Sequence, residues 1–253
     1  MNHVIIALIV FVCVSASVLL GLYLRDHLPE HHLSDESSGA IKLGIGLVAT
    51  IAALVLGLLI SSAKGSFDTV ENDLIHNAAS MVRLDSVLAQ YGSETEPLRT
   101  TLRHNYASWI ELLDSSGGTR SARLDNPEVI GRMVGFQRSV AALVPASDVE
   151  RDLQARALRI TDDVFAARSL ALLQREGTLP MPLLVVLVCW LAIIFGTFGL
   201  LAPRNGTIIA AYLLCALSAS GAIFLILEMD TPLDGIVRVS MGPMREALAR
   251  LGH

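Results

Sequence analysis

The segment from residue 27 to residue 36 holds the side chains whose types and spacing are best suited to chemistry. It contains three histidines and three carboxylic acids, namely His27, Glu30, His31, His32, Asp35 and Glu36. Imidazole and carboxylate groups are common ligands of divalent metals, and histidine titrates near neutral pH, so this segment could bind a cation or respond to pH. A solvated polar loop has the same composition, and we assign no metal site to it.

Two more acidic residues, Glu228 and Asp230, come directly after an apolar run. Carboxylates at the edge of a membrane could line an ion path. The favoured interpretation is that they are interfacial residues that contact water and pair with the nearby Arg238. We therefore treat Glu228 and Asp230 as interfacial acidic candidates.

The common enzymatic motifs are absent from the sequence. There is no glycine-rich phosphate loop, no HExxH, no GxSxG and no CxxC, so neither an enzymatic activity nor a cofactor is predicted. The cysteines, Cys13, Cys189 and Cys215, all lie in apolar runs, which argues against a disulfide framework. The formal net charge of -5 comes from mixed charges without a basic excess, which argues against a nucleic-acid partner.

The elements that must position these groups are apolar helices. The chain of 253 residues is 53% hydrophobic and only 17% charged, with a mean hydropathy of +0.56. A helix needs about 20 apolar residues to cross the hydrocarbon core of a bilayer. Four runs meet that length: Val4–Leu24, Ile41–Ala63, Met181–Ala202 and Thr207–Leu227. The sequence therefore predicts an all-α integral membrane protein with four transmembrane helices, the first of them a retained helix and not a signal peptide.

The orientation in the bilayer follows from the lysines and arginines near the membrane, which favour the cytoplasmic side. With four spans, the N-terminus, residues 64–180 and the tail lie on one side. That side carries Lys64, Arg83, Arg168, Arg175, Arg238, Arg245 and Arg250, against Arg25, Lys42 and Arg204 on the other. We predict cytoplasmic N- and C-termini, with a cytoplasmic helical domain inserted between the second and third spans.

This topology predicts four segments. Residues 1–63 form a first transmembrane pair with a short outer loop, and residues 64–180 form the cytoplasmic helical domain. Residues 181–228 form a second transmembrane pair, and residues 229–253 form a cytoplasmic C-terminal tail.

The inserted domain is predicted to be helical throughout. Beyond the second span, a seam at heptad spacing continues, apolar at every position except Asn77: Phe67, Val70, Leu74, Asn77, Met81, Leu84, Leu88 and Tyr91. The second span is therefore expected to continue, straight or hinged, to Gly92. Asn77 either marks the register of an oligomer or faces water on a helix that packs within its own domain. Further helices are expected after Glu96, after Asn126 and after the capping box that begins at Ser147.

The second span has two contrasting faces. Small residues recur every four positions at Ala49, Ala53, Gly57 and Ser61, which favours close approach of another helix. The other face is bulky, and its members are candidates for lining a pore that gates by dewetting: Leu47, Ile51, Leu54, Leu58 and Ser62. A plainer interpretation is that one face contacts a helix and the other contacts lipid.

Two blocks of sequence carry a resemblance to a known family. The first runs from His32 to Gly92 and includes LVLGLL at residues 54–59 and Ser62-Ala63-Lys64. The second includes Trp190, FGTFGL at residues 195–200, APRN at residues 202–205 and LILEMD at residues 225–230. On these residues the chain resembles a bacterial membrane-protein family described as bestrophin-like, a domain of unknown function.

The resemblance implies a function as well as a fold. Bestrophins are oligomeric anion channels with four spans per subunit and a helical cytoplasmic domain between the second and third. The chain departs from them in having no aromatic residue in the second span and no acidic cluster similar to their calcium clasp. The hypothesis is a homo-oligomeric channel of the bacterial inner membrane, for an inorganic anion. The alternative is a non-conducting scaffold or regulator that binds a partner through its cytoplasmic helices.

Overall fold

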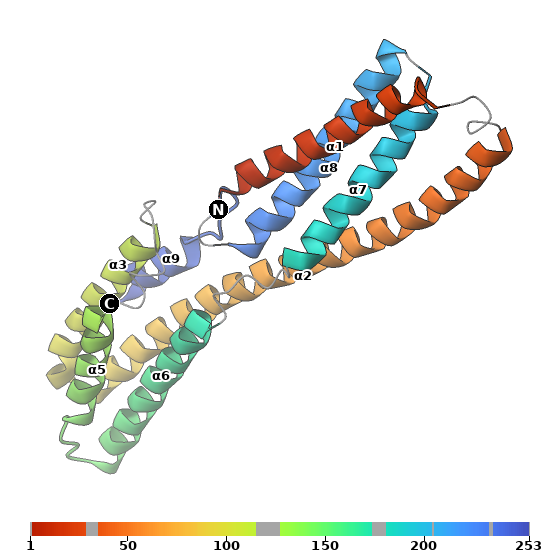
Figure 1. Cartoon of the computed structure of the whole chain (residues 1–253). Coiled ribbons are helices and arrows are strands. Elements are labelled where there is room, and N and C mark those ends of the chain that lie inside the picture. The colour runs from red at the N-terminus through yellow and green to blue at the C-terminus, as the bar shows by residue number, and fades with distance from the viewer. Residues whose placement is uncertain are drawn as a thin grey trace. The chain divides into compact units, whose positions relative to one another are not determined.

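The computed structural model describes residues 2–28, 35–114, 127–173, 181–203, 205–232 and 235–252. These residues form helices joined by short connections, and no strand occurs among them. The chain divides into two compact units (Figure 1). Unit 1 contains Met1–Ser66 and Gly177–Thr231, and unit 2 contains Phe67–Glu176 and Pro232–His253. Each unit is therefore built from two separate stretches of sequence.

Four helices in the described part of the chain are long and apolar enough to cross a membrane. They are α1 (His3–Arg25), α2 (Asp35–Tyr91), α7 (Met181–Leu201) and α8 (Gly206–Asp230). Their bounds lie close to the predicted spans, except that α2 is much longer than its apolar run. The prediction of an all-helical membrane protein with four candidate spans is confirmed.

Helices α1 and α7 pack backbone against backbone. A Cβ atom added to Gly21 would lie 2.0 Å from the Gly196 carbonyl oxygen, and one added to Gly199 would lie 2.2 Å from the Val18 carbonyl oxygen. Only glycine fits at such distances. At the end of α1, the guanidinium of Arg25 donates a hydrogen bond to the carbonyl of Ala202. The two helices are thus held in close contact along their length.

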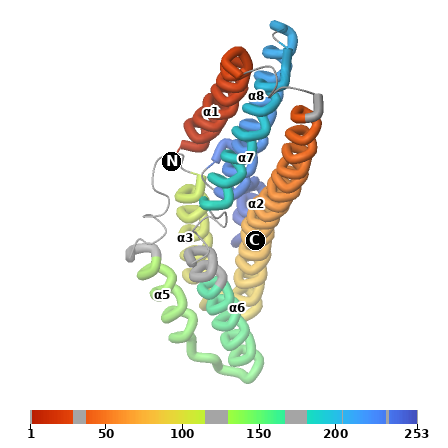
Figure 2. Tube along the Cα trace, turned by 45° about the vertical axis from the view of Figure 1, so that its right-hand side comes forward, coloured from red at the N-terminus to blue at the C-terminus, as the bar shows by residue number. Residues whose placement is uncertain are grey.

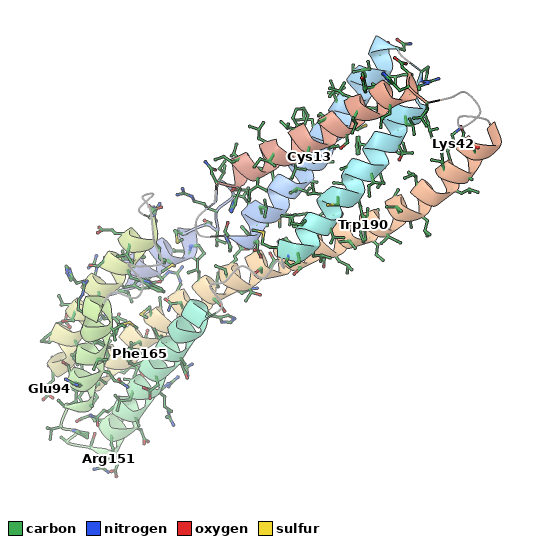
Figure 3. The ribbon with its side chains drawn as sticks, viewed as in Figure 1. Cys13, Lys42, Glu94, Arg151, Phe165 and Trp190 are labelled. Atoms are coloured by element: carbon green, nitrogen blue, oxygen red, sulfur yellow. The ribbon has the colours of Figure 1, made fainter. Side chains whose placement is uncertain are left out.

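Helix α8 completes a compact group with α1 and α7 (Figure 2). One apolar cluster joins these helices, and α2 contributes to it through Ala52, Leu59 and Ala63. The outside of unit 1 remains apolar, as expected for helices surrounded by lipid. The cysteines are unpaired and exposed, and Cys13 is labelled on α1 in Figure 3.

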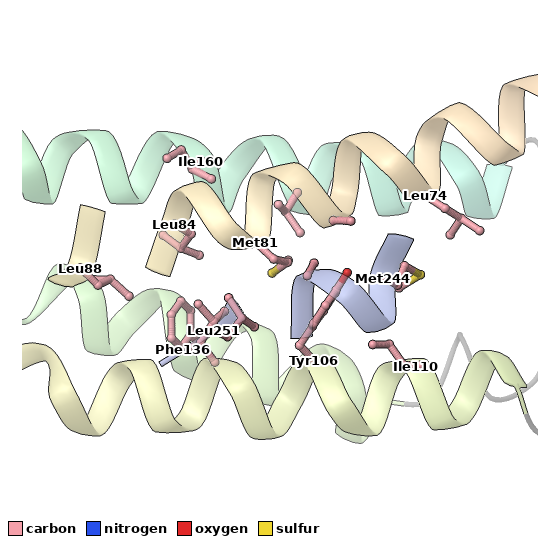
Figure 4. Packing of buried hydrophobic residues seen from close by; sticks show 14 of the residues in the cluster. Leu74, Met81, Leu84, Leu88, Tyr106, Ile110, Phe136, Ile160, Met244 and Leu251 are labelled. Carbon is pink, nitrogen blue, oxygen red and sulfur yellow. The ribbon is translucent and has the colours of Figure 1, made fainter. Parts of the chain in front are cut away.

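Unit 2 is a helical bundle around a core of its own. It contains α2 from Phe67 onward, the short 3-10 helix η2 (Ser93–Thr95), α3 (Glu96–Asp114), α5 (Pro127–Ala141), α6 (Asp148–Leu173) and α9 (Gly242–Arg250). Figure 4 shows the apolar side chains that these helices direct toward one another. Helix α2 ends before Gly92, whose φ of 135° lies in the region that favours glycine.

The heptad seam on α2 packs inside unit 2. Leu74, Met81, Leu84 and Leu88 belong to its buried core. Asn77 is buried as well, with 8% of its surface exposed. The interpretation that this helix packs within its own domain is therefore correct, but Asn77 does not face water.

The chain's C-terminal segment belongs to the same core. Met244 and Leu251 are both fully buried. The Asp85 carboxylate, which is also buried, accepts hydrogen bonds from Arg99 at 2.9 and 3.0 Å and from the Gly252 backbone N–H at 3.1 Å. Pro232 and residues 235–252 thus belong to unit 2.

Candidate functional site

Helix α2 presents three distinct faces within unit 1. Its buried face, which includes Ala52, Leu59 and Ala63, joins the apolar cluster of α1, α7 and α8. Because an α-helix turns by about 100° per residue, the bulky face and the small-residue face each lie about 120° from this buried face. About two thirds of the circumference of this part of α2 is therefore left uncovered by the residues that the structure describes.

The pore-lining candidates all lie on the uncovered surface. Leu47 is 65% exposed, Ile51 40%, Leu54 65% and Leu58 61%, and Ser62 is exposed as well. Four of the five are large aliphatic side chains, so they form a continuous apolar stripe along one side of the helix. The structure brings them together on one face, as the spacing predicts, and places no part of the described chain over them.

The small-residue face is also uncovered. Ala53, Gly57 and Ser61 are exposed, and Ala49 is half-buried. A Cβ atom at Gly57 would meet no other atom within 4 Å. Ala49 packs against the apolar cluster of unit 1, whereas Ala53, Gly57 and Ser61 are left exposed by the described part of the chain, so the predicted role of this face in helix packing stays a prediction.

The interfacial acidic candidates lie at the end of α8, and they differ in their surroundings. The Glu228 side chain is buried, with 4% of its surface exposed, and its Oε1 lies 2.9 Å from His3 Nδ1 at the start of α1. Asp230 is half-buried. This contact joins the start of α1 to the end of α8.

Sequence reasoning missed His3 and the three glycines of the α1–α7 contact. The signal for His3 was present, because the predicted topology places the start of the first span and the end of the fourth on the same side of the membrane. The signal for the contact was the pair Gly196 and Gly199, one helical turn apart on α7.

The polar segment after α1 lies mostly outside the described residues. His27 is described, and its Nδ1 lies 3.1 Å from the Tyr23 carbonyl oxygen. Residues 29–34, and the side chains of Asp35 and Glu36, are not described. Among the described residues no group of three His, Cys, Asp or Glu side chains is arranged to hold a metal ion.

Comparison with known proteins gives one match. The sequence model of the Bestrophin-like domain matches residues 12–244. Searches of curated proteins and of solved structures find no match. The matched range includes most of α1 and all of α2, α7 and α8, together with the helices of unit 2 as far as Met244. The chain therefore belongs to the Bestrophin-like domain family, a family of channel-like membrane proteins.

Proposed function

We propose that the protein is a homo-oligomeric channel for inorganic anions in the bacterial inner membrane, with its N- and C-termini and unit 2 in the cytoplasm. The observation that carries the proposal is the uncovered surface of α2, where Leu47, Leu54 and Leu58 are each more than 60% exposed in a single chain. Membership of the Bestrophin-like family supports it.

The three faces of α2 suit a ring of identical subunits. The buried face holds α2 to its own unit through Ala52, Leu59 and Ala63. The small-residue face, with Gly57 at its centre, allows the close approach of a neighbouring subunit. The bulky face is then directed toward the axis of the ring, where aliphatic side chains form a narrow apolar constriction that conducts when it is wetted.

The first test is a measurement of ion selectivity. Purified protein in planar bilayers under a potassium chloride gradient should give a reversal potential shifted toward the chloride equilibrium potential. A shift toward the potassium potential would contradict anion selectivity and would direct attention to Glu228 and Asp230, whose carboxylates attract cations.

The second test asks whether the bulky face lines the path. In a background with the native cysteines replaced by serine, Leu47, Ile51, Leu54 and Leu58 are changed one at a time to cysteine and treated with an anionic thiol reagent. We expect modification to block the current. The matched control is Leu214→Cys on α8, which is 67% exposed in the single chain but lies on another helix. Equal block at Leu214 and on α2 would contradict the assignment.

The alternative function is a non-conducting scaffold that binds a protein partner through unit 2. Two exposed aliphatic side chains favour it: Val144, between α5 and α6, is 82% exposed, and Val149, in the first turn of α6, is 69% exposed. The stoichiometry separates the two functions, since a channel of this kind must be a ring. Only monomers in native mass analysis in mild detergent would refute the channel and leave the scaffold.

A further inference from the structure

Two adjacent aliphatic side chains are exposed in the segment that joins α8 to α9. Ile236 is 73% exposed and Val237 is 37% exposed. Exposed aliphatic side chains are common on protein surfaces, so the meaning of this pair depends on its position. The pair follows a candidate membrane span at a short distance along the chain, because α8 ends at Asp230. The apolar medium closest to it in sequence is therefore the bilayer.

The segment is a loop whose two ends are held together. The Val239 backbone N–H donates a hydrogen bond to the Pro232 carbonyl at 3.2 Å. The Arg238 Nε donates a second hydrogen bond to the Gly235 carbonyl at 2.9 Å. Gly235 and Val239 are buried, and Val239 belongs to the core of unit 2, whereas residues 236–238 are exposed. Because the loop already has a defined conformation, its tip can bind a surface at a small cost in ordering.

Chain connectivity keeps this tip close to the bilayer. The contact between Glu228 and His3 lies where the apolar run of α8 ends. Pro232 is four residues beyond Glu228, so it lies within about 14 Å of it, because an extended chain spans at most about 3.6 Å per residue. The hydrogen bond to Pro232 holds Val239 at the same level. Ile236 is three residues before Val239, a further reach of at most about 11 Å, so the tip can reach the headgroup layer.

The residues at the tip suit the interfacial layer of a bilayer. Loop backbone does not enter the hydrocarbon core, where its polar groups would be left without partners. In the hydrated headgroup layer the backbone keeps water, while aliphatic side chains can extend to the acyl boundary. Arg238 follows the pair and is exposed. The stem of an arginine can lie along apolar surface while its guanidinium stays among polar groups.

We propose that Ile236 and Val237 form a membrane anchor, which inserts into the phospholipid interface on the side of the bilayer where α8 ends. The anchor fixes the connection between α8 and α9 to the lipid surface. Exposure alone does not lead to this assignment. Val144 is even more exposed, at 82%, but it lies between α5 and α6, remote in sequence from every candidate span.

The test measures contact with lipid for the full-length protein in nanodiscs of phosphatidylcholine and phosphatidylglycerol. The native cysteines, Cys13, Cys189 and Cys215, are replaced by serine, and Val237→Cys is labelled with a bimane fluorophore. Phospholipids with brominated acyl chains quench a label that contacts lipid, and aqueous iodide quenches a label that contacts water.

Two labelled positions provide the references. Val144→Cys is the matched control for an exposed aliphatic position remote from the spans, and Leu214→Cys on α8, at a residue that is 67% exposed, is the reference for a candidate span. We expect brominated lipid to quench the label at position 237 about fivefold more than the label at position 144, because an interfacial anchor reaches the acyl boundary. Iodide should show the opposite order.

A second pair of variants asks whether the aliphatic side chain drives insertion. With the label at position 237, Ile236→Asp should lower quenching by brominated lipid by about fivefold, because a carboxylate is disfavoured at the acyl boundary. The matched variant Ile236→Leu should retain it. Position 236 is exposed, so neither change disturbs the core. A monodisperse elution profile and unchanged helix content by circular dichroism show that each variant is folded.

Three outcomes would overturn the proposal. Strong iodide quenching at position 237, with no more quenching by brominated lipid than at position 144, would place the tip in water. Protection from both quenchers would place the tip against protein, such as a second copy of the chain. Unchanged quenching by brominated lipid in folded Ile236→Asp would show that the exposed aliphatic pair does not cause the contact.

Discussion

The close contact between α1 and α7 predicts that substitution of Gly199 destabilises the protein. Substitution to alanine places a methyl group 2.2 Å from the Val18 carbonyl oxygen and 3.2 Å from the Leu22 backbone nitrogen. Both neighbours are backbone atoms, so no side chain can rotate out of the way. Ordinary contact needs about 3.5 Å, and the helices must therefore separate by about 1 Å at this point.

The cost of that separation is estimated from overpacking in protein cores, which destabilises by about 1–3 kcal/mol. Separation also loosens the packing around Val18, which is fully buried and whose carbonyl oxygen faces Gly199. For a chain of this size, each kcal/mol lowers the unfolding temperature by about 2–4 °C. We expect Gly199→Ala to lower it by about 2–12 °C.

The assay is the loss of monodisperse protein on heating in detergent, followed by size-exclusion chromatography. The matched control is Gly46→Ala on α2, where an added Cβ meets no atom within 4 Å. Gly21→Ala should behave as Gly199→Ala does, because its methyl group would lie 2.0 Å from the Gly196 carbonyl oxygen. If both variants are as stable as Gly46→Ala, the close contact between α1 and α7 is refuted.

Three further predictions concern unit 2, and each is checked by unfolding of the full-length protein. Asp85→Ala removes the buried carboxylate that lies 2.9 Å from the Arg99 guanidinium, so the free energy of unfolding should fall by on the order of 3 kcal/mol in chemical denaturation. Burial raises the pKa of Tyr106. The unfolded chain therefore loses this proton first, stability should fall as pH rises above about 10, and Tyr106→Phe should move the alkaline unfolding midpoint to higher pH; an unchanged midpoint would contradict this. Leu251→Ala, at a fully buried position, should cost about 2–5 kcal/mol, whereas Val144→Ala, at a side chain that is 82% exposed, should cost less than about 0.5 kcal/mol; equal losses would place Leu251 outside the core.

The membrane helices could be predicted from sequence because their signal is local. A run of about 20 apolar residues is sufficient to identify a span, whatever its neighbours are. The predicted Met181–Ala202 and the observed α7 (Met181–Leu201) differ by one residue. The heptad pattern from Phe67 to Tyr91 likewise predicted that α2 continues beyond the bilayer length, because the burial of one side of a helix repeats in its own sequence.

Which helices pack against each other was harder to predict, because the pairing of two helices depends on the sequences of both. Gly21 fits against Gly196 only when α1 and α7 have the right register, which neither sequence determines alone. The C-terminal helix carried a detectable signal in the spacing of Met244, Ala247 and Leu251.

On the candidate site, the pattern of α2 predicted which residues share a face but not what covers each face. The exposure of Leu47, Leu54 and Leu58 in a single chain agrees with a surface for lipid, for a neighbouring subunit or for a conduction path. A helix sequence specifies the direction of its side chains, whereas the identity of the medium they meet depends on assembly. Measurements of ion selectivity and of block by cysteine modification determine whether the bulky face of α2 lines a conduction path.

The interleaved composition of the two units has a consequence for biosynthesis. The ribosome synthesises α1 long before α7, so α1 is first present in the bilayer without the helix against which it packs. Unit 2 is likewise unfinished until α9 emerges, after the last membrane helix has been made. A nascent chain that stalls after α8 would contain the four candidate spans but would leave the core of unit 2 open, and exposed apolar surface of this kind is recognised by quality-control proteases and chaperones.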